Sequence, residues 1–121
     1  MRDKARDRGR LEDIVKYAGN IEKMMAGVSF ERFEEDILVY YAVMKNVEIV
    51  GEAAYMLTND FKDIHPETPW KEVQGMRHCL VHGYASIDKH ELYGTAINDI
   101  PVLRQQAIKY LSETNWEDWE I

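Results

Sequence analysis

Four side chains that can take part in acid–base or phosphate chemistry fall within eight residues, in the segment RHCLVHGY at positions 77–84. Arg77 keeps its charge and can grip a phosphate with a fork of N–H donors. His78 and His82 titrate near neutral pH, so either can take or give a proton. A cation beside an imidazole suits RNA cleavage without a metal ion, because a base can remove the 2′-hydroxyl proton while the cation stabilises charge on the attacked phosphate.

Spacing alone leaves two other interpretations of the histidines open. A histidine near the C-terminus of a helix often interacts only with the helix dipole and the last carbonyl groups. His78 and His82 also have the i, i+4 spacing of a two-histidine zinc pair. The metalloprotease pattern puts glutamate directly after the first histidine, where this chain has Cys79, and the sequence places no third ligand. We therefore predict neither a metal site nor a cofactor.

The charge of the chain limits how it can bind nucleic acid. The net charge is −7: residues 1–10 hold five basic and two acidic side chains, which leaves ten basic and twenty acidic ones in the remainder. A body of that charge does not attract RNA by bulk electrostatics. Contact with RNA would rely on a local cluster, either Arg77 with its histidines or the basic N-terminal segment. The alternative for that segment is a solvated first helical turn.

Composition predicts one intracellular domain spanning residues 1–121. The length suits a single domain, and the hydrophobic fraction of 45% is enough for a core. The single cysteine excludes an internal disulfide, which fits a reducing cytoplasm. The N-terminus is too charged for a signal peptide, and no apolar run approaches the ~18 residues of a membrane span. We expect a soluble, cytoplasmic protein with no membrane contact.

Helical periodicity dominates the chain, and no sustained period-two alternation predicts a strand. The predicted fold is an all-α antiparallel bundle of four main helices, with residues 59–70 as a loop and the tail tryptophans Trp116 and Trp119 packed on the bundle or on a partner. The predicted helices are 6–26, ended by Gly27; about 30–58, capped by Ser29; 69–82, with Thr68 at the N-cap and Pro69 at N1; and one capped by Asp88, kinked at Pro101 and apolar as far as Leu111.

A continuous third helix would position the polar cluster. At about 100° per residue, Arg77, His78 and His82 occupy one arc turned away from the core, with Val81 in the middle of it. An apolar residue among polar ones predicts a half-buried groove or a subunit interface. Arg77 and His82 lie about 140° apart on the helix, so a second copy across a two-fold axis would help to complete the site. The second half of the helix at 30–58 is apolar on more than one side, which also favours a partner chain.

Arg77, His82 and Tyr84 together match the R-x-x-x-x-H-x-Y signature of HepT-like proteins, the HEPN-superfamily toxins of prokaryotic toxin–antitoxin pairs. The segments VEIVGEAA (47–54), HPETPWKEVQGMRHCLVHGY (65–84) and INDIPVLRQQ (97–106) also resemble that family. The resemblance covers most of the chain and weakens before residue 30 and after residue 111.

The resemblance implies a HEPN-like four- to five-helix bundle that forms a homodimer, with two R-x-x-x-x-H sites at a shared cleft. It further implies a ribonuclease toxin that needs no metal, and a cognate antitoxin that is an MntA-like nucleotidyltransferase. That partner would transfer AMP from ATP to Tyr84 and silence the toxin. AMP would add phosphate charge and bulk beside Arg77 and His82, which would occupy the cleft that RNA needs.

The resemblance leaves some site residues less defined. Many relatives carry a small polar residue where this chain has His78, so His78 is accessory: it would assist the chemistry, compete for the proton or hold a loop. Glu52 of the IVGEA segment is a second accessory residue that would orient Arg77, the alternative being a solvated helical glutamate. Without the resemblance, Tyr84 would be interpreted as a packed aromatic after the helix. His65 and His90 are assigned no role.

Two other functions fit the same residues. One is a non-catalytic helical subunit that uses the cleft to hold a nucleotide or the nucleotidyltransferase, and the acidic body favours it. The other is a structural dimer whose cleft has lost activity.

Overall fold

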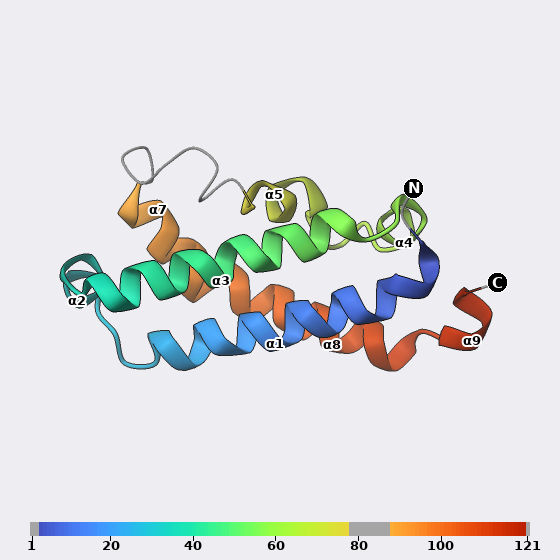
Figure 1. Cartoon of the computed structure of the whole chain (residues 1–121), viewed down its shortest axis with the longest axis horizontal. Coiled ribbons are helices and arrows are strands. Elements are labelled where there is room, and N and C mark those ends of the chain that lie inside the picture. The colour runs from blue at the N-terminus through green and yellow to red at the C-terminus, as the bar shows by residue number, and fades with distance from the viewer. Residues whose placement is uncertain (1–2, 78–87, 121) are drawn as a thin grey trace.

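The computed structural model describes residues 3–77 and 88–120, and within these two ranges it contains helices and no strand (Figure 1). The prediction of an all-α fold is confirmed. The elements are the 3₁₀ turn η1 (Lys4–Arg6), α1 (Asp7–Met25), α2 (Phe30–Glu35), α3 (Ile37–Met56), α4 (Asn59–Asp63), α5 (Trp70–Gly75), α7 (Lys89–Gly94), the π-helical η3 (Thr95–Asp99), α8 (Ile100–Glu113) and α9 (Trp116–Trp119).

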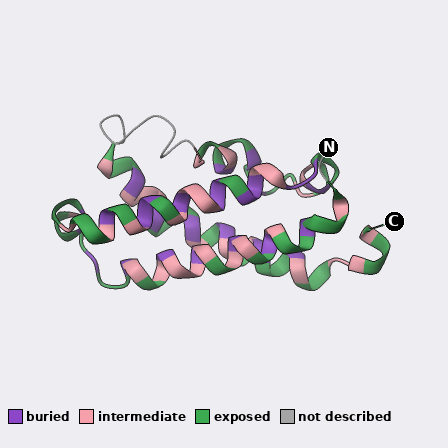
Figure 2. Cartoon of the chain, in the orientation of Figure 1, coloured by how far each residue is buried: buried purple, intermediate pink, exposed green. Residues whose placement is uncertain are grey.

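Three long helices, α1, α3 and α8, form the body of the molecule, and α1 packs against both of the others. It runs antiparallel to α3 and to α8 (Figure 1). All but one member of the predicted apolar stripe of α1 are fully or almost fully buried, and the polar residues between them stay nearer the surface (Figure 2). Helix α1 ends as predicted before Gly27, which adopts a φ of +72°. The buried members are Leu11, Ile14, Ala18, Ile21 and Met25, and the predicted sixth member, Val15, is half-buried.

The predicted helix at 30–58 is two helices, so that prediction is wrong at Asp36. Ser29 does cap the first of them, accepting a hydrogen bond from the backbone of Arg32. Asp36 then adopts extended backbone, with φ −86° and ψ 97°, and its carboxylate accepts from the backbone N–H groups of Leu38 and Val39. An aspartate that caps a new helix in this way interrupts the old one.

The second half of α3 is buried by its own chain. Val50, Ala53 and Ala54 are at most 5% exposed, and the elements that pack on α3 include α1 and α5. Of the apolar residues that favoured a partner chain here, Ile49 stays half-buried, so little of this half is left for a partner to cover. The exposed apolar residues of α3 lie at its start instead, at Ile37, Leu38 and Tyr41.

Residues 59–70 are not wholly a loop, because α4 occupies the first five of these twelve residues. Thr58 caps it by accepting from the backbone of Phe61. The Phe61 side chain is completely buried. A short polar segment thus gains enough apolar contact to fold as a helix.

The predicted third helix begins later and ends earlier than expected. Pro69 occupies the N-cap position, and Thr68 instead turns its hydroxyl toward Gln106 and Tyr110 on α8. The α-helix ends at Gly75, and the chain continues as a turn through Met76 and Arg77. A single helix through Arg77 is therefore wrong, and the angular positions derived from it do not hold. The remainder of that prediction, residues 78–82, lies outside the described ranges.

The last predicted helix starts and continues as expected, with an irregular middle. Asp88 caps it, accepting from the backbone of His90 and Glu91. The helix continues past Pro101, as the sequence predicts. The π-helical segment η3 ends at Asp99, two residues before that proline. Because proline lacks an N–H and crowds the carbonyl four residues back, a wider turn relieves the clash. The chain changes direction between α7 and α8 (Figure 1).

The C-terminal tryptophans pack on the bundle, which confirms one of the two expected placements. The indole of Trp119 donates to the buried carboxylate of Asp7 at 2.9 Å, and Trp116 stacks on Phe61. Asp7 also accepts from the backbone N–H and the hydroxyl of Thr58, at 2.9 and 2.6 Å. One carboxylate thus ties the start of α1 to the α3–α4 turn and to the C-terminal segment.

Among the described residues, no helix is both long enough and apolar enough to cross a bilayer.

Candidate functional site

Two of the predicted site residues, Arg77 and Glu52, are described by the structure. His78, His82 and Tyr84 lie outside the described ranges, as does Cys79. The site can therefore be built from Arg77 and the elements that hold it.

The side chain of Arg77 lies against α3 and remains 30% exposed. Its guanidinium carbon is 3.6 Å from the centroid of the Tyr55 ring, and Nη1 is 3.9 Å from Glu52 Oε2. Glu52 and Tyr55 are three residues apart on α3, so they present to one face of that helix. The ring fixes the plane of the guanidinium through a cation–π contact, and the carboxylate sits at its edge.

The structure thus brings Glu52 and Arg77 together, as the sequence analysis expected, and adds Tyr55, which that analysis missed. The signal available was its position: an aromatic side chain three residues after Glu52, on the same helical face.

Gly51 explains how Arg77 comes so close to α3. A Cβ atom at this position would stand 2.3 Å from the backbone nitrogen of Arg77 and 2.8 Å from the carbonyl carbon of Met76. The turn that follows α5 therefore rests directly on the backbone of α3, where only glycine leaves room. The guanidinium is positioned by main-chain packing as well as by its side-chain contacts.

The ion pair between Arg77 and Glu52 is long and partly solvated, so it binds the guanidinium weakly. A phosphate can accept two parallel N–H bonds from the same group, which is a stronger interaction. The arrangement therefore holds a cation in a fixed plane while leaving it available to an incoming anion.

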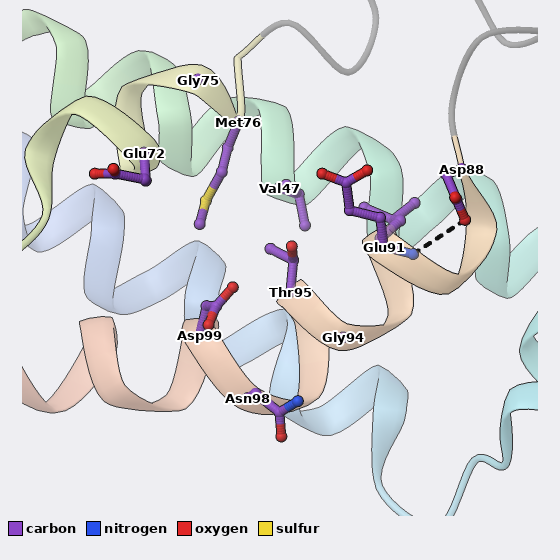
Figure 3. Close-up of a pocket in the computed structure, with 11 residues that line it drawn as sticks. Val47, Glu72, Gly75, Met76, Asp88, Glu91, Gly94, Thr95, Asn98 and Asp99 are labelled. Carbon is purple, nitrogen blue, oxygen red and sulfur yellow. Dashed lines mark hydrogen bonds between the residues drawn. The ribbon is translucent and has the colours of Figure 1, made fainter.

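An acidic pocket of about 710 Å³ lies on the other side of α5, between α5, α7 and η3 (Figure 3). Four carboxylates line it, from Glu72, Asp88, Glu91 and Asp99, and none of the described residues that line it is basic. Such a surface repels phosphate. Within the described ranges, no three His, Cys, Asp or Glu side chains group closely enough to hold a metal ion. The predicted alternative of a zinc pair at His78 and His82 lies outside those ranges.

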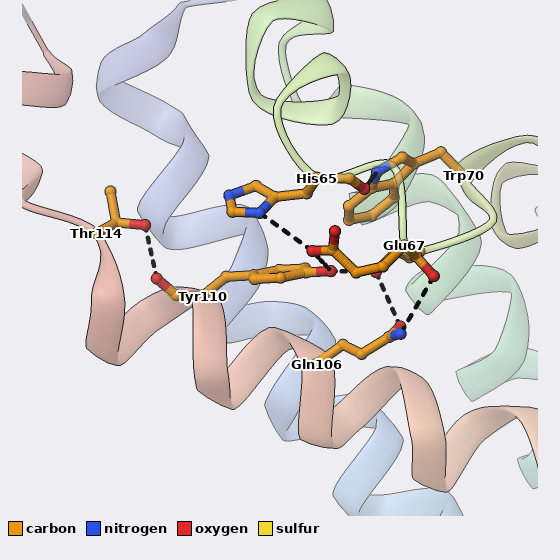
Figure 4. A network of polar contacts seen from close by, with 7 residues as sticks. His65, Glu67, Trp70, Gln106, Tyr110 and Thr114 are labelled. Atoms are coloured by element: carbon orange, nitrogen blue, oxygen red, sulfur yellow. Dashed lines mark hydrogen bonds and ion pairs between the residues drawn. The ribbon is translucent and has the colours of Figure 1, made fainter.

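His65 belongs to a second polar cluster, which fastens the loop before α5 to α8 (Figure 4). Its ring stacks on Tyr110 with centroids 4.0 Å apart, and Nδ1 is 3.4 Å from Glu67 Oε1. The Tyr110 hydroxyl donates to Glu67 at 2.7 Å and also contacts the buried Thr68 hydroxyl. The hydrogen bond from Tyr110 lowers the pKa of Glu67, and burial raises the pKa of Tyr110 to about 12.

The raised pKa of Tyr110 predicts how the stability of the fold depends on pH. A tyrosine pKa raised from about 10 to about 12 means that the unfolded chain loses its proton first, so stability falls as the pH rises through that window. Denaturant unfolding at a series of pH values should show this fall in the wild type and a smaller one in Tyr110→Phe. Parallel curves for the two proteins would contradict the assignment.

Comparison with known proteins identifies similar chains. Residues 14–110 match the family described as "Ribonuclease HepT-like". The chain is 42% identical over 94 residues to the "Probable ribonuclease HepT" of Thermococcus cleftensis, an alignment covering 78% of this chain and 86% of the relative.

Two further relatives, each named "Putative RNase", align with the chain over a comparable length at lower identity. One, from Methanocaldococcus jannaschii, is 32% identical over 97 residues, covering 80% of this chain and 89% of the relative. The other, from Caldanaerobacter subterraneus, is 33% identical over 103 residues, covering 85% and 92%. No solved structure matches the chain.

Proposed function

Because the chain belongs to the HepT-like ribonuclease family, we propose that it is a ribonuclease that cleaves RNA without a metal ion, with Arg77 and His82 as its catalytic residues. The observation that carries the proposal is the state of Arg77: a guanidinium held in a fixed plane by α3, partly exposed, and paired among the described residues with one distant carboxylate. That is what binding of a phosphodiester requires.

The proposed reaction divides the work between the two residues. His82 acts as base or acid: one imidazole takes the proton of the 2′-hydroxyl, whose oxygen forms a bond to the adjacent phosphorus. The bond from phosphorus to the 5′-oxygen breaks, and that oxygen receives a proton. Arg77 stabilises the charge that builds on the phosphate oxygens. Glu52 orients Arg77 before RNA binds, and His78 is accessory.

Regulation follows from the family resemblance. We propose that the chain is the toxin of a toxin–antitoxin pair, acts as a homodimer, and is silenced when an MntA-like nucleotidyltransferase transfers AMP to Tyr84. The exposed Ile37, Leu38 and Tyr41 at the start of α3 support a second copy, since they form an apolar surface that a monomer leaves in water. Mass spectrometry of the chain co-produced with its nucleotidyltransferase tests the modification.

Growth of bacteria that express the chain without the antitoxin tests the proposed function. The wild type should arrest growth, and His82→Ala should not, because it lacks the group that moves the proton. Equal growth of the two strains, at equal protein levels on an immunoblot, would count against catalysis.

A second candidate function is a non-catalytic subunit that holds a nucleotide or the nucleotidyltransferase. The four carboxylates of the acidic pocket, which Met76 also lines, favour the nucleotidyltransferase as the occupant, because they repel the phosphates of RNA and of a free nucleotide alike. Cleavage of RNA by the purified chain separates the two functions.

Tyr55 yields a prediction specific to the catalytic proposal. Tyr55→Leu removes the cation–π contact and should lower kcat/KM for RNA cleavage by about fivefold, in line with a contact of about 1 kcal/mol. Tyr55→Phe keeps the ring and should retain activity near that of the wild type. If the two variants lost activity equally with unchanged thermal stability, the ring would not be what positions Arg77.

A further inference from the structure

A second hollow lies on the side of α5 opposite the acidic pocket, and its charge has the opposite sign. It has a volume of about 510 Å³, within the range of small-ligand sites. We call it the basic hollow. Helices α3, α4 and α5 line it, through Tyr55, Asn59, Lys62, Asp63, Trp70, Lys71 and Gln74.

The basic hollow adjoins Arg77 through a shared side chain. Tyr55 lines the hollow, and the guanidinium of Arg77 lies on the same ring. A chain of nucleotides with one phosphate on Arg77 therefore passes either into this hollow or toward the acidic pocket. Helix α5 separates the two directions, because Lys71 and Gln74 line one and Glu72 and Gly75 line the other.

Charge decides between the two directions. Among the described residues that line them, the basic hollow has Lys62 and Lys71 against one carboxylate, that of Asp63, whereas the acidic pocket has four carboxylates and no lysine or arginine. In a chain with a net charge of −7, a local excess of positive charge beside Arg77 is a departure from the average surface. A polyanion bound at Arg77 is attracted to one side and repelled from the other.

The side chains of the basic hollow are also built for this task. The ammonium of Lys62 donates to Gln74 Oε1 at 2.7 Å and contacts the backbone carbonyl of Tyr55 at 3.4 Å, so its charge is held in place between α3 and α5. Lys71 is exposed on the first turn of α5. A positioned cation and an exposed one, beside an aromatic ring, are the usual parts of a groove for single-stranded nucleic acid.

We propose that the basic hollow is an RNA subsite that binds the phosphate next to the scissile one through Lys62 and Lys71. The inference rests on the proposed function, since it takes the scissile phosphate to lie at Arg77. It makes single-stranded RNA the substrate class and directs the strand over α4 and α5.

Binding of a fluorescent single-stranded oligoribonucleotide to the full-length chain tests this subsite. The measurement uses His82→Ala protein, so that the probe stays intact, and follows anisotropy over a series of salt concentrations. Adding Lys71→Ala should weaken binding severalfold and reduce the slope of log K against log salt by about 0.7, the value for one phosphate contact on a single strand. Lys71→Glu should weaken binding further.

The matched control is Lys109→Ala, which removes an exposed lysine from α8 that lines neither the basic hollow nor the acidic pocket. It should leave both affinity and slope unchanged. If Lys71→Ala behaved like Lys109→Ala while the wild type cleaved RNA, the subsite would be refuted and the ribonuclease proposal would stand. If Lys71→Ala weakened binding but the wild type did not cleave RNA, the subsite would stand as a binding site and the ribonuclease proposal would fail.

Discussion

Replacing Arg77 with alanine is expected to lower kcat/KM for RNA cleavage by about 10³-fold, the loss seen when one group that stabilises transition-state charge is removed. The side chain is partly exposed and its ion pair with Glu52 is weak, so the fold should hardly depend on it. The loss should therefore appear at unchanged thermal stability. Purified protein, a labelled RNA and initial rates at subsaturating substrate supply the measurement.

Arg77→Lys separates charge from geometry. Lysine keeps the charge but lacks the planar fork, and an ammonium packs less well on the Tyr55 ring, so only part of the activity should return. Arg32→Ala is the control, since it removes an exposed arginine from α2. Full activity of Arg77→Ala would show that this cation does not act on the phosphate.

Gly51→Ala is expected to lower both stability and activity, because the added Cβ would stand 2.3 Å from the backbone nitrogen of Arg77. The turn at Met76 and Arg77 must then move away from α3, which should cost about 2 kcal/mol of folding free energy as an overpacked contact. The same movement displaces the guanidinium from Tyr55 and Glu52. We expect RNA cleavage to fall by at least about tenfold at temperatures where the variant stays folded.

Gly9→Ala is the matched control for this substitution. Gly9 lies within α1 with no atom near the position of an added Cβ, so alanine should stabilise the chain by up to about 1 kcal/mol through its helix propensity. Denaturant unfolding and cleavage assays on both variants check the pair. If Gly51→Ala were as stable and as active as Gly9→Ala, the close contact between α3 and the turn would not position Arg77.

The parts of the fold that the sequence predicted are those set by local pattern. The apolar stripe of α1, the caps at Ser29 and Asp88, and the end of α1 before Gly27 each depend on a few neighbouring residues. The break at Asp36 was missed because an apolar period continues across it. The break comes from the Asp36 carboxylate, which accepts hydrogen bonds from two backbone N–H groups and so ends one helix and begins the next.

Tertiary contacts explain the other differences. Thr68 precedes Pro69 as an N-cap residue would, but its hydroxyl hydrogen-bonds to Gln106 and Tyr110, which are 38 and 42 residues away in the chain. Phe61 makes a helix of a segment that is polar overall, because the core accepts its ring. Neither contact can be derived from nearby residues, since both depend on how α8 and the C-terminal segment return to the bundle.

The candidate site shows the same division. The sequence motif predicted that Glu52 orients Arg77, and the structure brings the two side chains together. Tyr55 and Gly51 were not assigned a role at the site because their importance comes from the turn that follows α5. In the predicted continuous helix, the backbone of Arg77 would lie farther from α3 than the observed turn does.

Cleavage of a single-stranded RNA by the purified chain in the presence of a chelator tests the central claim most directly. We predict that the wild type cuts the RNA at an unchanged rate, leaves 2′,3′-cyclic phosphate ends, and fails on a strand with 2′-deoxyribose at the cleavage position, while His82→Ala is inactive. Loss of cleavage on chelation, or cleavage by His82→Ala at the wild-type rate, would contradict a metal-independent reaction carried by Arg77 and His82.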